Sequence, residues 1–507
     1  MNSNFSEEDI KKVAKGTGTT LVGSIVGGGF NFLSQIMIAR VLGVEAFGLY
    51  ALGFAAVRIC EIFAKLGLST GGMRFVSMYK DESKSKLKGV LISSTGISLL
   101  NGVLLGIILY FSSDFIAQKI FHKTNLTEAL QLFALSIPFV SSMGVASSLL
   151  LGFHTTKYTV YARNFVQPVT YIFLIVFFYL NGFKLDGVIY AFILSHVVAF
   201  IVCILYLKKI FPEFLSKYVT TDYEFKNLIS YSIPLLFLGF LHYFLSWTVI
   251  LVLGFLGSTK DVGIYRAASQ VTNLMTIFIT AVGSIYAPLV SEMFYNGEKK
   301  RMESIFKVTT RWIYLIVLPV SLVLIFSSKG VISIFGADYI EEGALVLIIL
   351  TVAQFVNCVT GGVGYTLTMT GKQKLELINS VGLVIVNIVL TIVLIPKYGT
   401  VGAAIATAIS VISINLLRLI EVYILYQMHP YSKGQIKILV PATISVLLIL
   451  CIHLLRVQYM WNTIINILIV SLSFITYMKI AGLDDEESYI LNLLKQKFSL
   501  KLRKANV

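Results

Sequence analysis

Apolar runs of about twenty residues, separated by short polar segments, cover most of this chain. A helix of that length crosses the hydrocarbon core of a bilayer, so windows of about 19 residues identify candidate spans. This pattern predicts roughly fourteen transmembrane helices. They are expected at residues 17–41, 47–66, 87–111, 126–151, 160–180, 187–207, 228–253, 263–290, 309–327, 343–368, 375–395, 401–426, 438–455 and 461–478.

One glycine-containing pattern occurs twice. The segments LG and FGLY within residues 42–50 recur as LG and VGIY within residues 256–265, about 215 residues later. A repeat with six spans in each copy predicts two six-helix lobes that enter the membrane in the same direction, followed by two extra helices. The expected parts are an N-terminal tail (1–16), an N-lobe (17–208), a linker (209–227), a C-lobe (228–427), two additional helices (438–480) and a basic tail (481–507).

Composition supports this class of protein. Of the 507 residues 56% are hydrophobic and only 13% are charged, whereas soluble proteins carry about 25% charged residues. Continuous apolar runs favour an all-α polytopic membrane protein over a barrel of short alternating strands. The polar first sixteen residues argue against a cleavable signal peptide.

The net charge of +15 would suit a nucleic-acid partner, but its distribution indicates a membrane. Lys and Arg gather in alternate short loops, and with a cytoplasmic N-terminus about 28 of them lie inside, as the positive-inside rule requires. We therefore expect a multi-pass protein of the cytoplasmic membrane, with both termini cytoplasmic and no nucleic-acid partner. The basic loops would contact anionic lipid.

Three ionisable residues interrupt the second predicted span. Arg58, Glu61 and Lys65 are three and four positions apart, which places them on one helix face. Because charges are costly in lipid, this face is expected to meet protein or a water-filled cavity. The matching helix of the second copy carries a similar face: Arg266, Gln270 and Asn273. Cations suit phosphate oxygens and amides suit sugar hydroxyls, so these faces predict a site for an anionic, hydroxyl-rich solute.

Other polar positions extend this candidate site. Arg74 follows a glycine-rich turn at the cytoplasmic edge, and further polar pairs lie within spans: Asn31 and Gln35, Asn164 and Gln167, and Gln354 and Asn357. The alternative is that Arg58–Glu61–Lys65 is a self-neutralising ladder and that the amides only join helices. Arg418 and Glu421 are predicted to form a structural ion pair. No nucleotide-binding, catalytic or metal-ligand motif is found in the sequence, so neither catalysis nor a cofactor is expected.

Four segments carry a family resemblance: ARVLGVEAFGLYALG, GLSTGGMRFVSMYKDE, LGSTKDVGIYRAASQ and IYAPLVSEMFYNGEKKRM. Together they make the chain similar to the polysaccharide flippase (Wzx-type) branch of the MOP superfamily, which includes multidrug exporters and the lipid II flippase. The resemblance implies a flippase that moves a polyprenyl-diphosphate-linked oligosaccharide through a cavity between two lobes. It also implies cationic cavity residues, which map onto Arg58, Arg74 and Arg266, with Glu61 and Lys65 as additions. A monomer working beside glycan polymerases or glycosyltransferases is expected.

Two other functions stay open at this point. A cation-coupled exporter of small molecules with the same fold would need an acidic cation site, for which Glu61 is the main candidate. A membrane glycan polymerase or glycosyltransferase would need large external loops or acidic catalytic residues at a membrane boundary. The predicted loops are too short for this second alternative.

Overall fold

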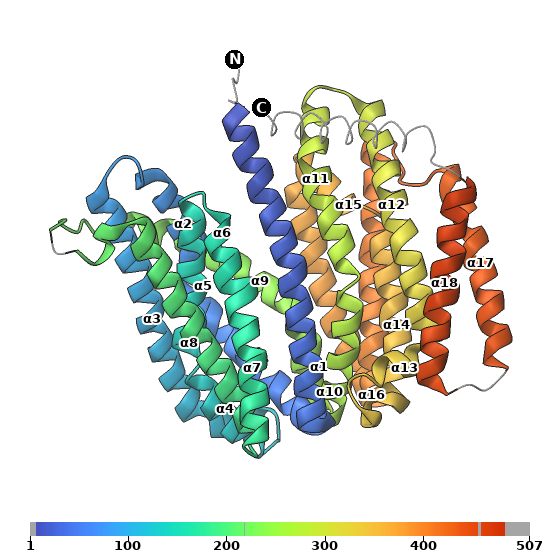
Figure 1. The fold of residues 1–507 in the computed structure, drawn as a ribbon, viewed down its shortest axis with the longest axis horizontal. Helices are drawn as coiled ribbons and strands as arrows, with labels where there is room; N and C mark the ends of the chain where they lie inside the picture. The colour runs from blue at the N-terminus through green and yellow to red at the C-terminus, as the bar shows by residue number, and fades with distance from the viewer. Residues whose placement is uncertain (1–6, 217, 455–457, 482–507) are drawn as a thin grey trace. The chain divides into compact units, whose positions relative to one another are not determined.

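The computed structural model describes residues 7–216, 218–454 and 458–481, and within these ranges it is helical without strands (Figure 1). Two compact units are present: one comprises the chain up to Ala267 with Phe335–Asp338 and Ile388–Ala403, and the other the remainder. The helices up to residue 256 are α1 (Glu7–Lys65), α2 (Leu68–Tyr79), α3 (Lys84–Phe115), η1 (Ile116–Ile120), α4 (Leu126–Ala134), α5 (Ile137–Gly152), α6 (Thr156–Thr159), η2 (Val160–Val166), α7 (Gln167–Leu180), α8 (Leu185–Ile210), η3 (Pro212–Leu215) and α9 (Phe225–Leu256). They are followed by α10 (Thr259–Asn273), α11 (Thr276–Tyr295), α12 (Lys299–Phe326), α13 (Ser328–Ile332), η4 (Ala337–Tyr339), α14 (Ile340–Val359), α15 (Val363–Met369), α16 (Gln373–Tyr426), α17 (Lys433–His453) and α18 (Tyr459–Ala481).

Two helices are far longer than one membrane crossing. α1 has 59 residues and α16 has 54, so at 1.5 Å per residue each would exceed the bilayer core of about 30 Å more than twofold. Each is interrupted by a glycine with non-helical backbone angles: Gly43 (φ 75°) in α1 and Gly399 (φ 55°) in α16. Positive φ is readily adopted only by glycine, so these residues mark the turns between the spans predicted on either side.

The number of spans depends on how these long helices are counted. By length and composition the described chain has ten candidate spans, or twelve if each of two bent helix pairs is one span. α4 and α5 are such a pair, bent by 46°, in place of the predicted fourth span. Twelve would become fourteen if α1 and α16 each cross twice, so the number fourteen stays a prediction.

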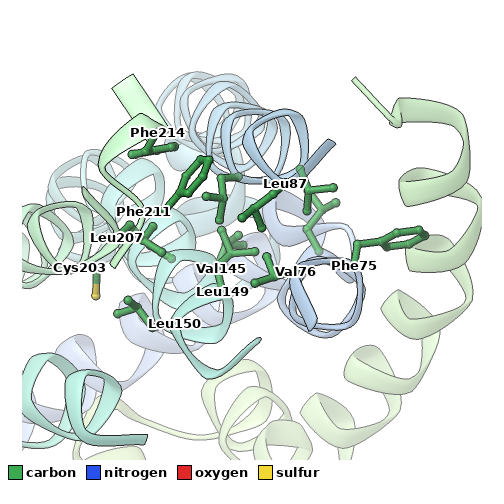
Figure 2. Packing of buried hydrophobic residues seen from close by; sticks show 14 of the residues in the cluster. Phe75, Val76, Leu87, Val145, Leu149, Leu150, Cys203, Leu207, Phe211 and Phe214 are labelled. Atoms are coloured by element: carbon green, nitrogen blue, oxygen red, sulfur yellow. The ribbon is translucent and has the colours of Figure 1, made fainter. Parts of the chain in front are cut away.

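The first unit has a hydrophobic cluster built mainly from α2, α3, α5 and α8 (Figure 2). Val76, Leu87 and Leu149 are fully or almost fully buried there. Phe211 and Phe214 at the beginning of the predicted linker belong to the same cluster. The linker is therefore packed against the helix bundle where it leaves α8.

The rest of the linker is tied to the first turns of α3. Lys88 is buried, and its ammonium donates to the carbonyl oxygens of Ser216 (2.6 Å) and Val219 (2.7 Å). Lys86 pairs with Glu224 at 2.6 Å, and this hydrogen bond lowers the pKa of that carboxyl. We call residues 211–216 and 218–224 the linker strap.

The repeated glycine motifs touch each other within the first unit. A Cβ built on Gly48 would lie 1.9 Å from the carbonyl oxygen of Thr259, and one built on Gly263 would lie 2.2 Å from that of Val44. Both pairs of equivalent positions, 44 with 259 and 48 with 263, are 215 residues apart. Such a reciprocal contact is expected when two copies of a motif are related by a two-fold axis.

In the second unit the last two helices pack on α12. Leu318 and Leu322 of α12 share a hydrophobic cluster with Ile438 of α17 and with Val470 and Phe474 of α18. α17 begins with a capping box, in which the side chains of Ser432 and Gln435 satisfy each other's backbone N–H groups. The pair is thus an integral part of this unit.

Candidate functional site

The first unit encloses a polar cavity of about 640 Å³, a size typical of small-molecule sites. Its described lining comes from α1, α2, α5, α6, η2, α7 and α8. The polar side chains in this lining are Asn31, Arg58, Glu61, Lys65, Ser69, Ser148, Thr156, Thr159, Arg163, Asn164, Gln167 and His196. The predicted cationic face thus lies on a cavity wall, together with hydroxyl and amide groups.

Arg58, Glu61 and Lys65 form a connected row along α1. The guanidinium of Arg58 donates to one Glu61 carboxylate oxygen at 2.7 Å, and the ammonium of Lys65 donates to the other. The side chains of Arg58 and Lys65 are 41% and 22% exposed, whereas that of Glu61 is 8% exposed. The cations are therefore more accessible than the carboxylate that joins them.

Two neighbours position these cations. The Arg58 guanidinium lies 4.8 Å from the centre of the Phe54 ring, a cation–π contact from the preceding turn. On α5, a Cβ added to Gly144 would lie 2.3 Å from the Lys65 nitrogen. The absence of a side chain at Gly144 therefore leaves room for the ammonium.

Another part of the lining is a π-helical turn, η2. Gly23 and Gly27 of α1 allow it to approach closely, since a Cβ on either would lie within 3 Å of Val160 or Asn164, respectively. This is the small-xxx-small arrangement that brings membrane helices into close contact. Arg163 on this turn lines the cavity and has no hydrogen bond or ion pair among the described residues.

Arg163 was not predicted as a site residue, although the neighbouring Asn164 and Gln167 were noted as polar positions. The sequence could have indicated it, because this arginine lies four positions before Gln167 at the beginning of a predicted span. Gln167 also contacts Ser195 of α8, with 3.3 Å between its amide nitrogen and the serine oxygen. Asn31 lines the cavity and donates to the carbonyl of Gly27 at 2.9 Å.

Several predicted residues of the first unit are not among the described residues that line this cavity. Arg74 of α2 is exposed and lies 4.2 Å from the centre of the Tyr231 ring. Arg266 of α10 lies 4.6 Å from the centre of the Trp247 ring. Gln35, one turn after Asn31 on α1, is partly buried. Both arginines thus make cation–π contacts with aromatic side chains of the first unit.

The remaining predicted residues belong to the second unit. Asn357 of α14 donates to Gln354 at 2.9 Å and accepts from Asn415 at 3.0 Å, so these amides form a chain of hydrogen bonds. Gln270 is partly buried and Asn273 is exposed at the end of α10. These contacts fit the alternative that amides join helices, and a role in substrate binding stays a prediction.

The predicted pairing of Arg418 with Glu421 is wrong. Arg418 forms a bidentate ion pair with Glu376, and Glu421 accepts a hydrogen bond from Asn379 at 2.6 Å. All four residues belong to α16, which reverses at Gly399. Its two halves therefore lie side by side, and each side chain finds its partner across the hairpin instead of one turn away.

The described residues contain no group of three or more His, Cys, Asp or Glu side chains that could hold a metal ion.

Comparison with known proteins identifies the family. The model of a family described as "Polysaccharide biosynthesis protein" matches residues 13–294, more than half of the chain. The chain belongs to this family. A second family model, MatE, matches residues 234–393.

Relatives agree with this assignment. Over 398 residues the chain is 27% identical to the "Probable low-salt glycan biosynthesis flippase Agl15" of Haloferax volcanii, covering 77% of this chain and 79% of that protein. A "Putative O-antigen transporter" of Shigella flexneri is 24% identical over 401 residues, with 75% and 90% covered. The predicted resemblance to the polysaccharide flippase branch is confirmed, and these names agree with a transport protein rather than an enzyme.

Solved structures show the same fold. The inward closed conformation of the lipid II flippase MurJ matches with a TM-score of 0.71 at 18% identity, covering 92% of this chain and 98% of that one. An inward-facing MATE multidrug transporter of the MOP superfamily matches with a TM-score of 0.64 at 16% identity, covering 78% and 94%. The predicted all-helical membrane fold of the MOP type is confirmed.

Proposed function

We propose that this protein is a flippase that moves a polyprenyl-diphosphate-linked oligosaccharide from the cytoplasmic to the outer leaflet by alternating access. The observation that carries the proposal is the polar cavity, where Arg58, Lys65 and Arg163 lie among hydroxyl and amide side chains. Arginine donates forked hydrogen bonds to phosphate oxygens, and amides pair with sugar hydroxyls. Membership of the family and the names of the relatives support this class of substrate.

The membrane potential would favour export of such a substrate. A diphosphate carries about two negative charges, and each is worth about 2.3 kcal/mol per 100 mV. With an inside-negative potential the anion moves outward downhill. The protein then needs only to replace water around the phosphates with cationic and amide donors.

The placement in the cell is part of the proposal. The distribution of Lys and Arg supports a cytoplasmic membrane protein with both termini inside. The predicted cavity between the N-lobe and C-lobe, through which the head group would pass, also stays a prediction. We further expect a functional monomer that receives its substrate from membrane glycosyltransferases.

The geometry gives less support to a cation-coupled exporter. Such a protein needs a carboxylate that can take up Na⁺ or H⁺, and the candidate Glu61 is already paired with Arg58 and Lys65. A pair of cations at this position disfavours the binding of a third. The glycan polymerase alternative lacks support from the relatives, which are named as flippases or transporters.

The test is export of surface glycan in a deletion strain that carries variants of this gene. Arg58→Ala should abolish export while the protein stays at normal amounts in the membrane, because the diphosphate loses its forked donor. Arg301→Ala is the matched control, since Arg301 is exposed and pairs only with nearby Glu298 among the described residues. Normal surface glycan in the Arg58→Ala strain would refute the proposal.

A further inference from the structure

Glu61 has no part in the function proposed above, yet it is the central residue of the cationic row. Its carboxylate accepts from Arg58 through one oxygen and from Lys65 through the other. The side chain is the least exposed of the three, at 8%. A buried carboxylate on the wall of an anion site opposes anion binding, so its presence there requires an explanation.

The formal charge of the cavity provides one. Its described lining holds three basic side chains, Arg58, Lys65 and Arg163, each with a formal charge of +1, and one carboxylate, Glu61. With His196 neutral the cavity carries a charge of +2, which is opposite and equal to that of a diphosphate. Without Glu61 the empty cavity would hold three unbalanced cations at membrane depth, a costly arrangement.

The two cations can serve Glu61 and a second anion. Arg58 donates to Glu61 through one nitrogen of a guanidinium that has five N–H groups, and its side chain is 41% exposed. Lys65 has three N–H groups, and its nitrogen occupies the space left by Gly144. An incoming phosphate can therefore contact both cations from the cavity before it displaces Glu61 from them.

We propose that Glu61 is a resident counter-ion that exchanges with the diphosphate of the substrate. This inference rests on the proposed function. When the substrate binds, its phosphate oxygens take over the donors of Arg58 and Lys65; when it leaves, Glu61 pairs with them again. The carboxylate thereby weakens binding and speeds release, which suits a carrier that must unload its cargo on every cycle.

The proposal predicts opposite effects on binding and on transport. Glu61→Gln should bind farnesyl diphosphate, a soluble probe for the lipid diphosphate, roughly tenfold more tightly, the size expected for one charge-assisted hydrogen bond. The same variant should export glycan several-fold more slowly, because release becomes limiting. Glu61→Asp keeps the carboxylate and should remain within about threefold of the unmodified protein in both measurements.

The measurements are equilibrium binding to the purified full-length protein in detergent and the rate of glycan export in cells. If Glu61 only orders its neighbours, Glu61→Gln will bind farnesyl diphosphate more weakly, and the inference is wrong. Unchanged affinity and unchanged export also overturn it. Failure of the proposed function looks different: the unmodified protein and Arg58→Ala would then bind the probe equally poorly.

A second pair of variants keeps the proposal testable if Glu61→Gln alone does not fold. Lys65→Met lowers the cavity charge to +1, and adding Glu61→Gln to it restores +2. The double variant thus has the same formal charge as the natural cavity. It should bind farnesyl diphosphate about tenfold more tightly than Lys65→Met alone, because Arg58 is released from Glu61. Equal affinities of these two variants contradict the exchange.

Discussion

At the level of single residues, spacing along a helix predicted which ionisable groups meet. Arg58, Glu61 and Lys65 were expected on one face because they are three and four positions apart, and they form one connected row in the structure. The spacing left open whether this face meets protein or a water-filled cavity. That depends on glycines of other segments, such as Gly144, whose missing side chain makes room for Lys65.

The role of Gly144 leads to a prediction. In Gly144→Ala the new methyl group would lie 2.3 Å from the Lys65 nitrogen, so the ammonium must move away from its place beside Glu61. The end of a lysine side chain shifts easily, and the loss of stability should stay below about 1 kcal/mol. Farnesyl diphosphate binding should change several-fold, as measured with the purified protein.

Gly96→Ala in α3 is the control for this variant, because nothing lies within 4 Å of its added Cβ. It should leave binding unchanged. Equal binding by Gly144→Ala and Gly96→Ala would show that Lys65 does not contribute to the anion site.

Arg163 and Arg418 show where spacing alone misleads. Arg163 lies on the π-helical turn η2, whose i→i+5 hydrogen bonds alter the 3.6-residue period on which face predictions depend. Arg418 pairs across a hairpin with Glu376, because Gly399 reverses the direction of the chain. For Arg163 the deciding feature is the backbone geometry of the π-helical turn, and for Arg418 it is the contact between two neighbouring spans. The hydrophobic pattern contains neither.

Among the structural elements, the linker strap departs most from expectation. Its charges predicted a polar connection between two lobes, and this division into lobes stays a prediction. The structure adds that Lys88 is buried and satisfies two carbonyl oxygens of the strap, while Gly89 allows the carbonyl of Asp222 to approach α3. A lysine near the end of a membrane helix is normally expected to face solvent or lipid headgroups. The sequence alone therefore does not indicate this role of Lys88.

Lys88→Met should therefore loosen the strap. The substitution keeps the length of the side chain but removes both hydrogen bonds to Ser216 and Val219, which should lower stability by about 1–3 kcal/mol. Limited proteolysis within residues 211–224 should become faster, and the melting temperature of the purified protein should fall.

Lys84→Met is the comparison for this element. Lys84 pairs with Glu213 at 2.5 Å, but its side chain is 66% exposed, and exposed ion pairs contribute only about 0–1 kcal/mol. It should change proteolysis and melting little. If the two variants behave alike, the buried ammonium of Lys88 is not what holds the strap.

For the whole molecule, the hydropathy pattern predicted the all-helical membrane class, whereas helices such as α2 (Leu68–Tyr79) and α13 (Ser328–Ile332) lie outside the predicted spans. It placed breaks at the turns after residues 41 and 395, and Gly43 and Gly399 provide them. It did not predict that the eighth span is divided into α10 and α11. Hydropathy indicates whether a segment lies in lipid or in water, but not where its helix bends or breaks.

The duplicated pattern leads to the last prediction, because its two copies touch through Gly48 and Gly263. Either Gly48→Ala or Gly263→Ala forces a methyl group against a backbone carbonyl oxygen, at 1.9 Å from Thr259 or 2.2 Å from Val44. A carbonyl cannot move aside like a flexible side chain, so each variant should lose about 1–3 kcal/mol of stability.

The reciprocal geometry makes this prediction sharper. If the two segments move apart once, both clashes are relieved. The double variant should therefore lose clearly less stability than the sum of the losses in the two single variants. Unfolding of the four purified proteins gives this double-mutant cycle, with Gly96→Ala as a substitution that meets no neighbouring atom. Additive losses would mean that the glycines pack independently, and the reciprocal contact would then not behave as one joint between the repeated motifs.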